Sequence, residues 1–291
     1  MSTLLDEEFL RRLERLQLVF RQRSRGRPLG SRLAPRAGMS LEFAEYRQYH
    51  PGDDFRYVDW NLYGRLDRLF IKVFTREEDV PVYLFVDVSR SMEIGDKLAY
   101  GVKLAAALAY LALKDLNRVA VFPFASRLQG GVPPRSGARQ VFEIFRYLRG
   151  LESAGETSIN ESLADFCQQH HEGGLAILIS DMLSEEGYQE GLACLRWHRF
   201  QPVVLQLLAP PDLAPLAGGE VRLVDVEGSG RAKPAYLGAQ TLGAYRARLS
   251  AYRRELEAFC QQLSCDYFLL STANPLEQSI FETLRRGVFL K

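Results

Sequence analysis

The segment from Val82 to Met92, Val-Tyr-Leu-Phe-Val-Asp-Val-Ser-Arg-Ser-Met, passes from an apolar run into three side chains that carry oxygen. The run has the length and the β-branched and aromatic content of a strand that is buried on both faces of a parallel sheet. Asp87, Ser89 and Ser91 then fall just beyond its carboxyl end, where open α/β sheets bind their ligands. One carboxylate and two hydroxyls form a hard, oxygen-only set, which suits Mg²⁺ better than zinc or copper.

Strand and helix patterns alternate along most of the remaining chain, as in a parallel α/β sheet. An alanine- and leucine-rich helix is expected over 96–116, and a second fully apolar strand over 175–180 ends at Asp181. Further strands are expected over 69–74, 118–124, 202–208, 221–226 and 267–270, and further helices over 140–148, 159–169, 186–197, 240–263 and 276–284. This order predicts an α/β fold with a doubly wound, mostly parallel, Rossmann-type sheet.

The composition is that of an ordinary globular protein. The chain has 291 residues, of which 47% are hydrophobic and 25% charged, and its net charge of +1 argues against a general attraction to nucleic acid or membrane. Its four cysteines form no C-x-x-C pair, so they indicate neither a zinc site nor a disulfide framework. The amino terminus is acidic, and no run approaches the roughly 18 apolar residues of a membrane span. We therefore expect a cytoplasmic protein.

The first 78 residues are expected to form an α+β extension that packs on the main domain, which we place at 79–291. The extension begins with an amphipathic helix over 6–21. A loop at 21–36 follows, rich in arginine and without an acid; its arginines are Arg21, Arg23, Arg25, Arg27, Arg32 and Arg36. Such a loop either grips phosphates or an acidic partner, or it is solvated and paired within the chain.

The rest of the extension is dense in charged and aromatic residues around a Pro51-Gly52-Asp53-Asp54 turn. Its charged residues are expected to form an internal lattice of ion pairs around Tyr46, Tyr49 and Trp60; they are Arg47, Arg56, Arg65, Asp53, Asp54 and Asp59. The alternative is an active site with Asp53 or Asp59 and His50 as acid and base. No nucleophile or oxyanion device accompanies these residues.

Two later residues add oxygen-bearing side chains to those that follow the first strand. Thr157 lies in a Gly-containing loop, and Asp181 follows the second apolar strand. Because central strands of a doubly wound sheet deliver their carboxyl-terminal loops to one crevice, these residues can meet Asp87, Ser89 and Ser91. The pattern resembles the metal-ion-dependent adhesion site (MIDAS) of von Willebrand factor A domains, with all five positions filled. The resemblance implies a von Willebrand factor A-like main domain.

A second pattern precedes the first strand. Tyr49 to Trp60 reads Tyr-His-Pro-Gly-Asp-Asp-Phe-Arg-Tyr-Val-Asp-Trp, ahead of Asp-x-Ser-x-Ser-Met. The two together resemble the bacterial family known as domain of unknown function 58, whose pattern Tyr-x-Pro-Gly-Asp-Asp-x-Arg-x-x-Asp-Trp is matched at every fixed position. The resemblance covers about residues 40–185 well and the remainder only at the level of fold.

The resemblance implies roles for the five residues. Ser89 and Ser91 would bind the metal directly, and Asp87 would lie near it, through water. Thr157 and Asp181 would complete the coordination shell of the metal, either directly or through waters. The metal is expected to be Mg²⁺, with Mn²⁺ or Ca²⁺ as alternatives. Few charged ligands leave such an ion electron-poor, so an open position favours a carboxylate from outside.

Members of this family commonly accompany MoxR-type AAA+ ATPases. The implied function is therefore that of a chaperone-like or complex-assembly adaptor, which binds this ATPase or a client protein through a metal-bridged Glu or Asp. Arg90, between the two serines, either steers an acidic ligand at the rim or is a solvated side chain. We expect neither a nucleic-acid partner nor an enzymatic activity.

Two other functions are compatible with an aspartate at the end of a strand. A Mg²⁺-dependent phosphoester hydrolase or phosphotransferase also begins its site there, but it needs a second acid where this chain has Ser89. The second alternative is a purely structural domain without metal, in which Ser91 or Thr157 caps a helix.

Overall fold

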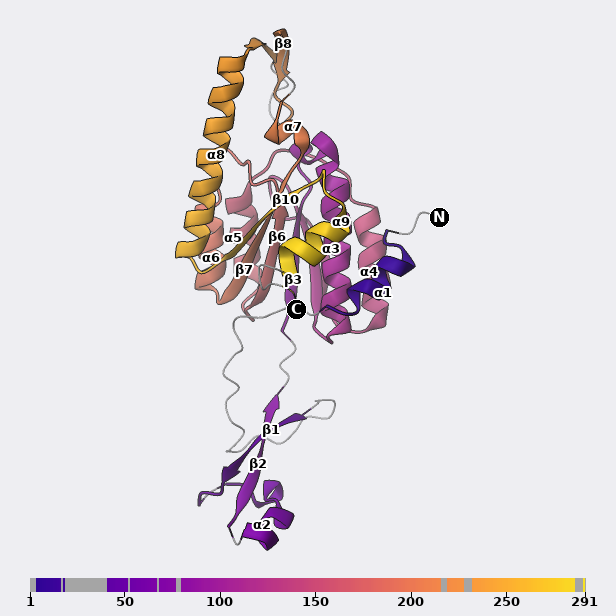
Figure 1. Cartoon of the computed structure of the whole chain (residues 1–291), viewed down its shortest axis with the longest axis vertical. Helices are drawn as coiled ribbons and strands as arrows, with labels where there is room; N and C mark the ends of the chain where they lie inside the picture. The colour runs from indigo at the N-terminus through magenta and orange to yellow at the C-terminus, as the bar shows by residue number, and fades with distance from the viewer. Residues whose placement is uncertain are drawn as a thin grey trace. The chain divides into compact units, whose positions relative to one another are not determined.

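The structure is a computed structural model that describes residues 4–16, 18, 41–51, 53–66, 68–76, 80–215, 219–227, 232–285 and 290. Two compact units make up the chain (Figure 1): the larger comprises Met1–Phe20 and Val80–Lys291, and the smaller comprises Arg21–Asp79. From the sequence we grouped the N-terminal helix with the residues up to 78, whereas the structure places it in the larger unit. The arginine-rich loop at 21–36 lies outside the described residues.

A six-stranded sheet organises the larger unit. Its strand order is β10-β7-β6-β3-β4-β5, and every neighbouring pair is parallel except β4 and β5. The strands are β3 (Val82–Asp87), β4 (Val119–Phe124), β5 (Val132–Arg135), β6 (Gly174–Ser180), β7 (Phe200–Leu208) and β10 (Asp266–Ser271). The predicted doubly wound α/β class is confirmed. β5 was not predicted because Pro133 and Pro134 interrupt its pattern, which is tolerated at the edge of a sheet.

Helices cover both faces of this sheet. In β3, Val82, Leu84 and Val86 belong to one hydrophobic cluster, while Tyr83 and Phe85 belong to the other. The first cluster lies under α1 (Glu7–Leu13), α3 (Lys97–Lys114) and α4 (Ala138–Arg149), and the second under α5 (Ile159–Gln169), α6 (Gln189–Trp197) and α8 (Ala239–Gln262) (Figure 1). β3 is therefore buried on both faces, as its continuous apolar run indicated.

The position of β3 defines the edge of the sheet at which a ligand is expected. The chain passes from β3 through α3 to β4 on one side, whereas β6 pairs with β3 on the other side. The strand order thus reverses at β3, and loops diverge from the carboxyl ends of β3 and β6 at this switch point. Asp87 ends β3, and Asp181 directly follows β6.

Short elements connect or extend this framework. A 3₁₀ segment, η2 (Arg90–Asp96), links β3 to α3, and α7 (Pro210–Leu213) follows β7. An antiparallel hairpin of β8 (Gly219–Val224) and β9 (Ala232–Leu237) precedes α8, and Figure 1 shows β8 near the start of that helix. The chain ends with α9 (Leu276–Gln278) and a π-helical turn, η3 (Ser279–Leu284).

The smaller unit is an antiparallel pair with a short helix. β1 (Leu41–Gln48) pairs with β2 (Phe70–Arg76), and η1 (Phe55–Tyr57) and α2 (Trp60–Leu66) lie between them in sequence. Within the part of the chain that is described, no helix combines the length and the apolar character needed to cross a membrane.

The N-terminal helix is part of the core of the larger unit. Asp6 caps α1 by accepting a hydrogen bond from the backbone N–H of Phe9 at 2.7 Å. Phe9 and Leu13 are buried in the cluster that contains α3, and the Phe9 ring meets the ring of Phe281 edge to face. This burial explains why α1 belongs to the larger unit although residues 21–79 separate the two in sequence.

We expect Leu13→Ala to lower the free energy of unfolding by about 2–5 kcal/mol, because Leu13 is fully buried and its truncation leaves a cavity. Urea denaturation of the full chain measures this loss. Arg11→Ala, on the exposed side of the same helix, is the control and should change it by less than about 0.5 kcal/mol. Equal effects of the two substitutions would show that α1 is not packed.

Candidate metal and partner-binding site

Asp87 is a buried carboxylate at the end of the central strand. Its Oδ1 accepts a hydrogen bond from the backbone N–H of Ser89 at 2.9 Å, and its Oδ2 accepts one from the hydroxyl of Ser180 at 2.6 Å. No ion pair to Asp87 is found among the described residues. Burial, reinforced by the nearby charge of Asp181, raises the pKa of Asp87 to about 7. The site therefore holds an acid whose charge is not compensated by a protein cation.

Three hydroxyl-bearing residues come from the loops after β3 and before α5. The hydroxyls of Ser89 and Ser91 are 3.0 Å apart. The loop that carries Thr157 is fixed to the loop after β3, because Arg90 N–H donates to the carbonyl of Gly155 at 3.1 Å. Gly155 has a φ of +80°, which favours glycine at this position. The loops after β3 and before α5 thus present their hydroxyls on one side of the sheet edge.

Asp181 is held by a buried lysine. Lys97 Nζ lies 2.7 Å from Asp181 Oδ2 and 3.2 Å from Asp212 Oδ2, and the Lys97 side chain is 1% exposed. The other Asp181 oxygen accepts from the N–H of Leu183. Burial lowers the pKa of Lys97, but the charges and hydrogen bonds of Asp181 and Asp212 outweigh burial and raise it. Lys97 therefore stays charged and neutralises part of the acidic cluster.

Glu227, in the loop after β8, contacts two of these hydroxyl-bearing residues. Its Oε1 accepts from Thr157 Oγ1 at 2.9 Å and from Ser91 N–H at 3.3 Å, and its Oε2 accepts from Thr157 N–H at 3.1 Å. Ser91 and Thr157 are therefore joined through one carboxylate.

All five residues of the sequence-predicted set lie at this edge of the sheet. Asp87, Ser89 and Ser91 are linked by hydrogen bonds, Thr157 is joined to Ser91 through Glu227, and Asp181 faces Lys97 while influencing Asp87 electrostatically. Arg90, the residue expected at the rim of the site, has an exposed side chain.

Four participating residues were not found from the sequence. They are Lys97, Ser180, Asp212 and Glu227. The one available signal was a lysine at the start of a helix that is apolar over most of its circumference, which implies a buried charge in need of partners. Glu227 carried no signal, because its loop lies 70 residues beyond Thr157.

The candidate acid–base residues of the smaller unit have structural partners. Arg47 pairs with Asp53 at 2.8 Å, and Arg56 pairs with Asp54 at 2.6 Å. The hydrogen bond from His50 N–H, followed by that from Arg47, lowers the pKa of Asp53. Asp59 accepts from two N–H groups in the first turn of α2. Asp53 and Asp54 are thus each paired with an arginine, whereas no ion pair to Asp87 is found among the described residues.

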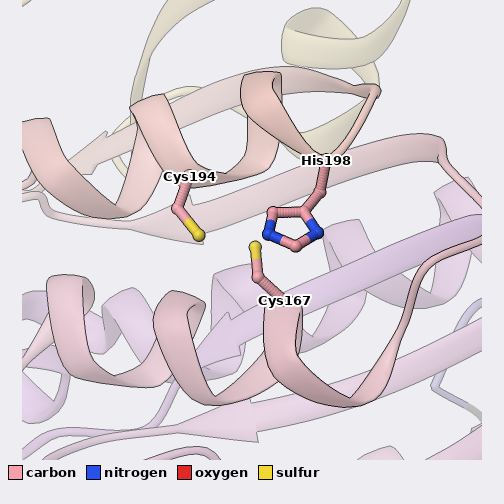
Figure 2. Close-up of side chains that lie close together, drawn as sticks. All are labelled: Cys167, Cys194 and His198. Carbon is pink, nitrogen blue, oxygen red and sulfur yellow. The ribbon is translucent and has the colours of Figure 1, made fainter.

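A separate cluster of soft ligands lies between two helices. Cys167 of α5 lies close to Cys194 of α6 and to His198, which follows α6 by one residue (Figure 2), with the possible ligand atoms within 4.8 Å of one another. The sequence did not indicate this cluster because its cysteines form no short motif. Burial and a hydrogen bond with Cys194 raise the pKa of Cys167, so this thiol is held protonated, as in a packed core cysteine.

The arrangement at the sheet edge is suited to binding a hard cation. Its oxygen atoms come from one buried carboxylate and three hydroxyls, and the adjacent Lys97 keeps Asp181 and Asp212 from adding two uncompensated charges. Oxygen ligands of this kind are preferred by Mg²⁺ and Ca²⁺.

Removal of the buried lysine charge is expected to be costly. Lys97→Met should lower the free energy of unfolding by about 3–5 kcal/mol, because Asp181 is left buried without its cation. Chemical denaturation of the full chain is the measurement, with Lys103→Met on the exposed side of α3 as the control. A loss below about 1 kcal/mol would contradict the assigned role of this ion pair.

The comparisons with known proteins place the chain among uncharacterised relatives. An uncharacterized protein of Mycobacterium tuberculosis (strain ATCC 25618 / H37Rv) is 25% identical over 231 residues, which cover 76% of this chain and 72% of the relative. Among solved structures, an aerotolerance-related membrane protein from Bacteroides fragilis is 15% identical, with a TM-score of 0.45, covering 71% of this chain and 99% of that one. A von Willebrand factor type A structure from Catenulispora acidiphila is 19% identical, with a TM-score of 0.36, covering 46% and 34%.

The predicted cytoplasmic location is corrected by these comparisons. The Bacteroides fragilis structure is described as that of a membrane protein, so the prediction, which used only the absence of a leader or apolar span, is contradicted and is withdrawn.

A family model describes most of the chain. It matches residues 45–243, which include the smaller unit's turn, the five predicted site residues and Glu227. Because this match spans more than half of the sequence, the chain belongs to the family described as protein of unknown function DUF58.

Proposed function

We propose that this protein is a metal-dependent, protein-binding adaptor. In this proposal Asp87, Ser89, Ser91, Thr157 and Asp181 hold Mg²⁺, or alternatively Mn²⁺ or Ca²⁺, and the ion binds an acidic side chain of a partner. The observation that carries the proposal is the buried carboxylate of Asp87, which has no cationic partner among the described residues.

A buried carboxylate of this kind needs compensation. An ionised group without a counter-charge costs several kcal/mol in a protein interior, and it either takes up a proton or binds a cation. Among the residues that the structure describes, one lysine pairs with both Asp181 and Asp212, and no cation pairs with Asp87. A divalent cation next to Asp87 would supply the missing charge, and it would return the pKa of this acid below its present value of about 7.

The hydroxyl groups support a ligand role over a capping role. Ser89 precedes η2 but makes no side-chain capping bond, and Thr157 Oγ1 donates to Glu227. The hydroxyls of Ser89 and Ser91 are hydrogen-bonded to each other. Each oxygen retains a lone pair for a metal. The purely structural alternative, in which Ser91 or Thr157 caps a helix, is therefore not favoured.

The same geometry favours binding over phosphoester chemistry. A nucleophilic aspartate must be ionised and reachable by the substrate, whereas Asp87 is fully buried and both of its oxygens accept hydrogen bonds from the protein. The second acid that such enzymes need is replaced by Ser89.

The proposed partner is a MoxR-type AAA+ ATPase or a client protein of that ATPase. The family resemblance supports this choice, and the adaptor would act in a chaperone-like or complex-assembly role. A metal with few charged ligands attracts a Glu or Asp from the partner. The exposed Arg90 lies between the two serines, where a positive charge speeds the approach of an acidic ligand.

Mg²⁺ binding is expected to strengthen with pH. The metal competes with the proton on Asp87, so the affinity should rise about tenfold between pH 6 and pH 8 and then level off, with proton release on the acid side. Isothermal titration calorimetry of the full chain measures both quantities. Asp87→Ala should abolish the heat of binding, whereas Glu190→Gln, an exposed acid on α6, should leave it unchanged. Equal heats for wild type and Asp87→Ala would contradict the metal site.

Partner binding should depend on the metal. Co-purification of the MoxR-type ATPase with the tagged chain is expected to be lost on chelation, restored by Mg²⁺ and abolished by Ser89→Ala, because Ser89 would bind the ion directly. Thermal unfolding of Ser89→Ala checks that the variant is folded. Retention of the ATPase by the chelated protein and by this variant would refute the metal-bridged mode of binding.

A further inference from the structure

The β8–β9 hairpin places a carboxylate in the candidate site. The hairpin itself is largely exposed: Leu223 and Val224 on β8 and Tyr236 on β9 are each more than half exposed. A two-stranded ribbon has little stability of its own, so its position depends on contacts beyond its strands. Glu227, in the loop that follows β8, is half-buried.

The contacts of Glu227 are directed at two of the five predicted metal ligands. Its carboxylate accepts hydrogen bonds from Ser91 N–H, Thr157 N–H and Thr157 Oγ1, at 3.3, 3.1 and 2.9 Å. Asp225 supports this arrangement, because its Oδ1 accepts from Glu227 N–H at 3.1 Å in a local turn that orients the loop. The carboxylate thus bridges loops that lie 136 and 70 residues away in sequence.

From these contacts we infer that Glu227 is an internal ligand of the site, which occupies the position of a partner's carboxylate and must leave before the partner binds. The inference rests on the proposed function, since it assigns a regulator to the same site. The hairpin acts as a tethered competitor, so the affinity for an external acidic ligand is reduced by the fraction of molecules in which Glu227 is seated.

The energetics are consistent with a reversible competitor. A tethered group has an effective concentration of about millimolar, so a partner in the micromolar range meets competition from within the chain. The carboxylate is held by three hydrogen bonds and no ion pair among the described residues, and its hairpin buries little apolar surface. Displacement of Glu227 therefore disturbs neither of the two hydrophobic clusters that pack on the faces of the sheet.

A peptide that copies the hairpin loop tests this inference without a known partner. The probe is the fluorescently labelled peptide Leu-Val-Asp-Val-Glu-Gly-Ser, residues 223–229, and its binding to the full chain is followed by fluorescence anisotropy with Mg²⁺ or with chelator. Glu227→Gln should bind the peptide at least about tenfold more tightly than wild type, because the competitor is removed. Glu220→Gln makes the same charge change on exposed β8 and should behave as wild type.

The outcomes separate the inference from the proposed function. Metal-dependent binding of equal strength to wild type and Glu227→Gln would overturn the internal ligand and would leave metal-bridged carboxylate binding intact. Failure of all three proteins to bind the peptide with Mg²⁺ would overturn the proposed function and the inference with it. A peptide with Gln in place of Glu should not bind, which shows that the carboxylate is the recognised group.

Hydrogen exchange provides a second readout that needs no added ligand. The amide protons of Ser91 and Thr157 donate to Glu227, so they should exchange about tenfold faster in Glu227→Ala, which has no side-chain acceptor, than in wild type or Glu220→Ala. Thermal unfolding verifies that each variant is folded. Unchanged exchange at both amides would overturn the inference, because it would show that Glu227 is not seated at these donors.

Discussion

The burial of the Asp87 carboxylate at the end of β3 is the constraint on which the site depends. β3 lies between β4 and β6, and apolar clusters cover both faces of the sheet, so water cannot solvate this acid. The hydroxyl of Ser180 and the N–H of Ser89 donate hydrogen bonds to the two oxygens of Asp87. These bonds orient the carboxylate but supply no positive charge. The unmet need for positive charge is what favours a cation at this edge of the sheet.

A buried framework and an exposed hairpin meet at this point. The loop after β3 and the loop before α5 are tied together by backbone hydrogen bonds, and Lys97 anchors Asp181 from the first turn of α3. These groups are fixed by the core. Glu227 comes from a hairpin whose strands are mostly exposed, so its position depends on a few hydrogen bonds. In our proposal, the fixed side chains form the metal site, and the few hydrogen bonds of Glu227 control the access of a partner to it.

Lys97 has a further consequence for what the site binds. By balancing one of the two negative charges of Asp181 and Asp212, it keeps the cluster from becoming strongly anionic, and an excess of negative charge would weaken the attraction of a bound metal for another carboxylate. The buried lysine therefore supports the fold and the proposed ligand preference at once. The ionised acids of the smaller unit, which pair with Arg47 and Arg56, have no such role.

Apolar periodicity predicted most of the strands and helices and the burial of β3 on both faces. The rule that parallel strands deliver their carboxyl ends to one edge predicted where five residues would meet, namely Asp87, Ser89, Ser91, Thr157 and Asp181. The tertiary structure alone revealed that α1 packs with the larger unit and that Lys97, Ser180, Asp212 and Glu227 complete the site. Local patterns encode burial and direction along the chain. They do not encode which polar side chains from distant loops meet, because those pairings are set by the packing of the whole sheet and its helices.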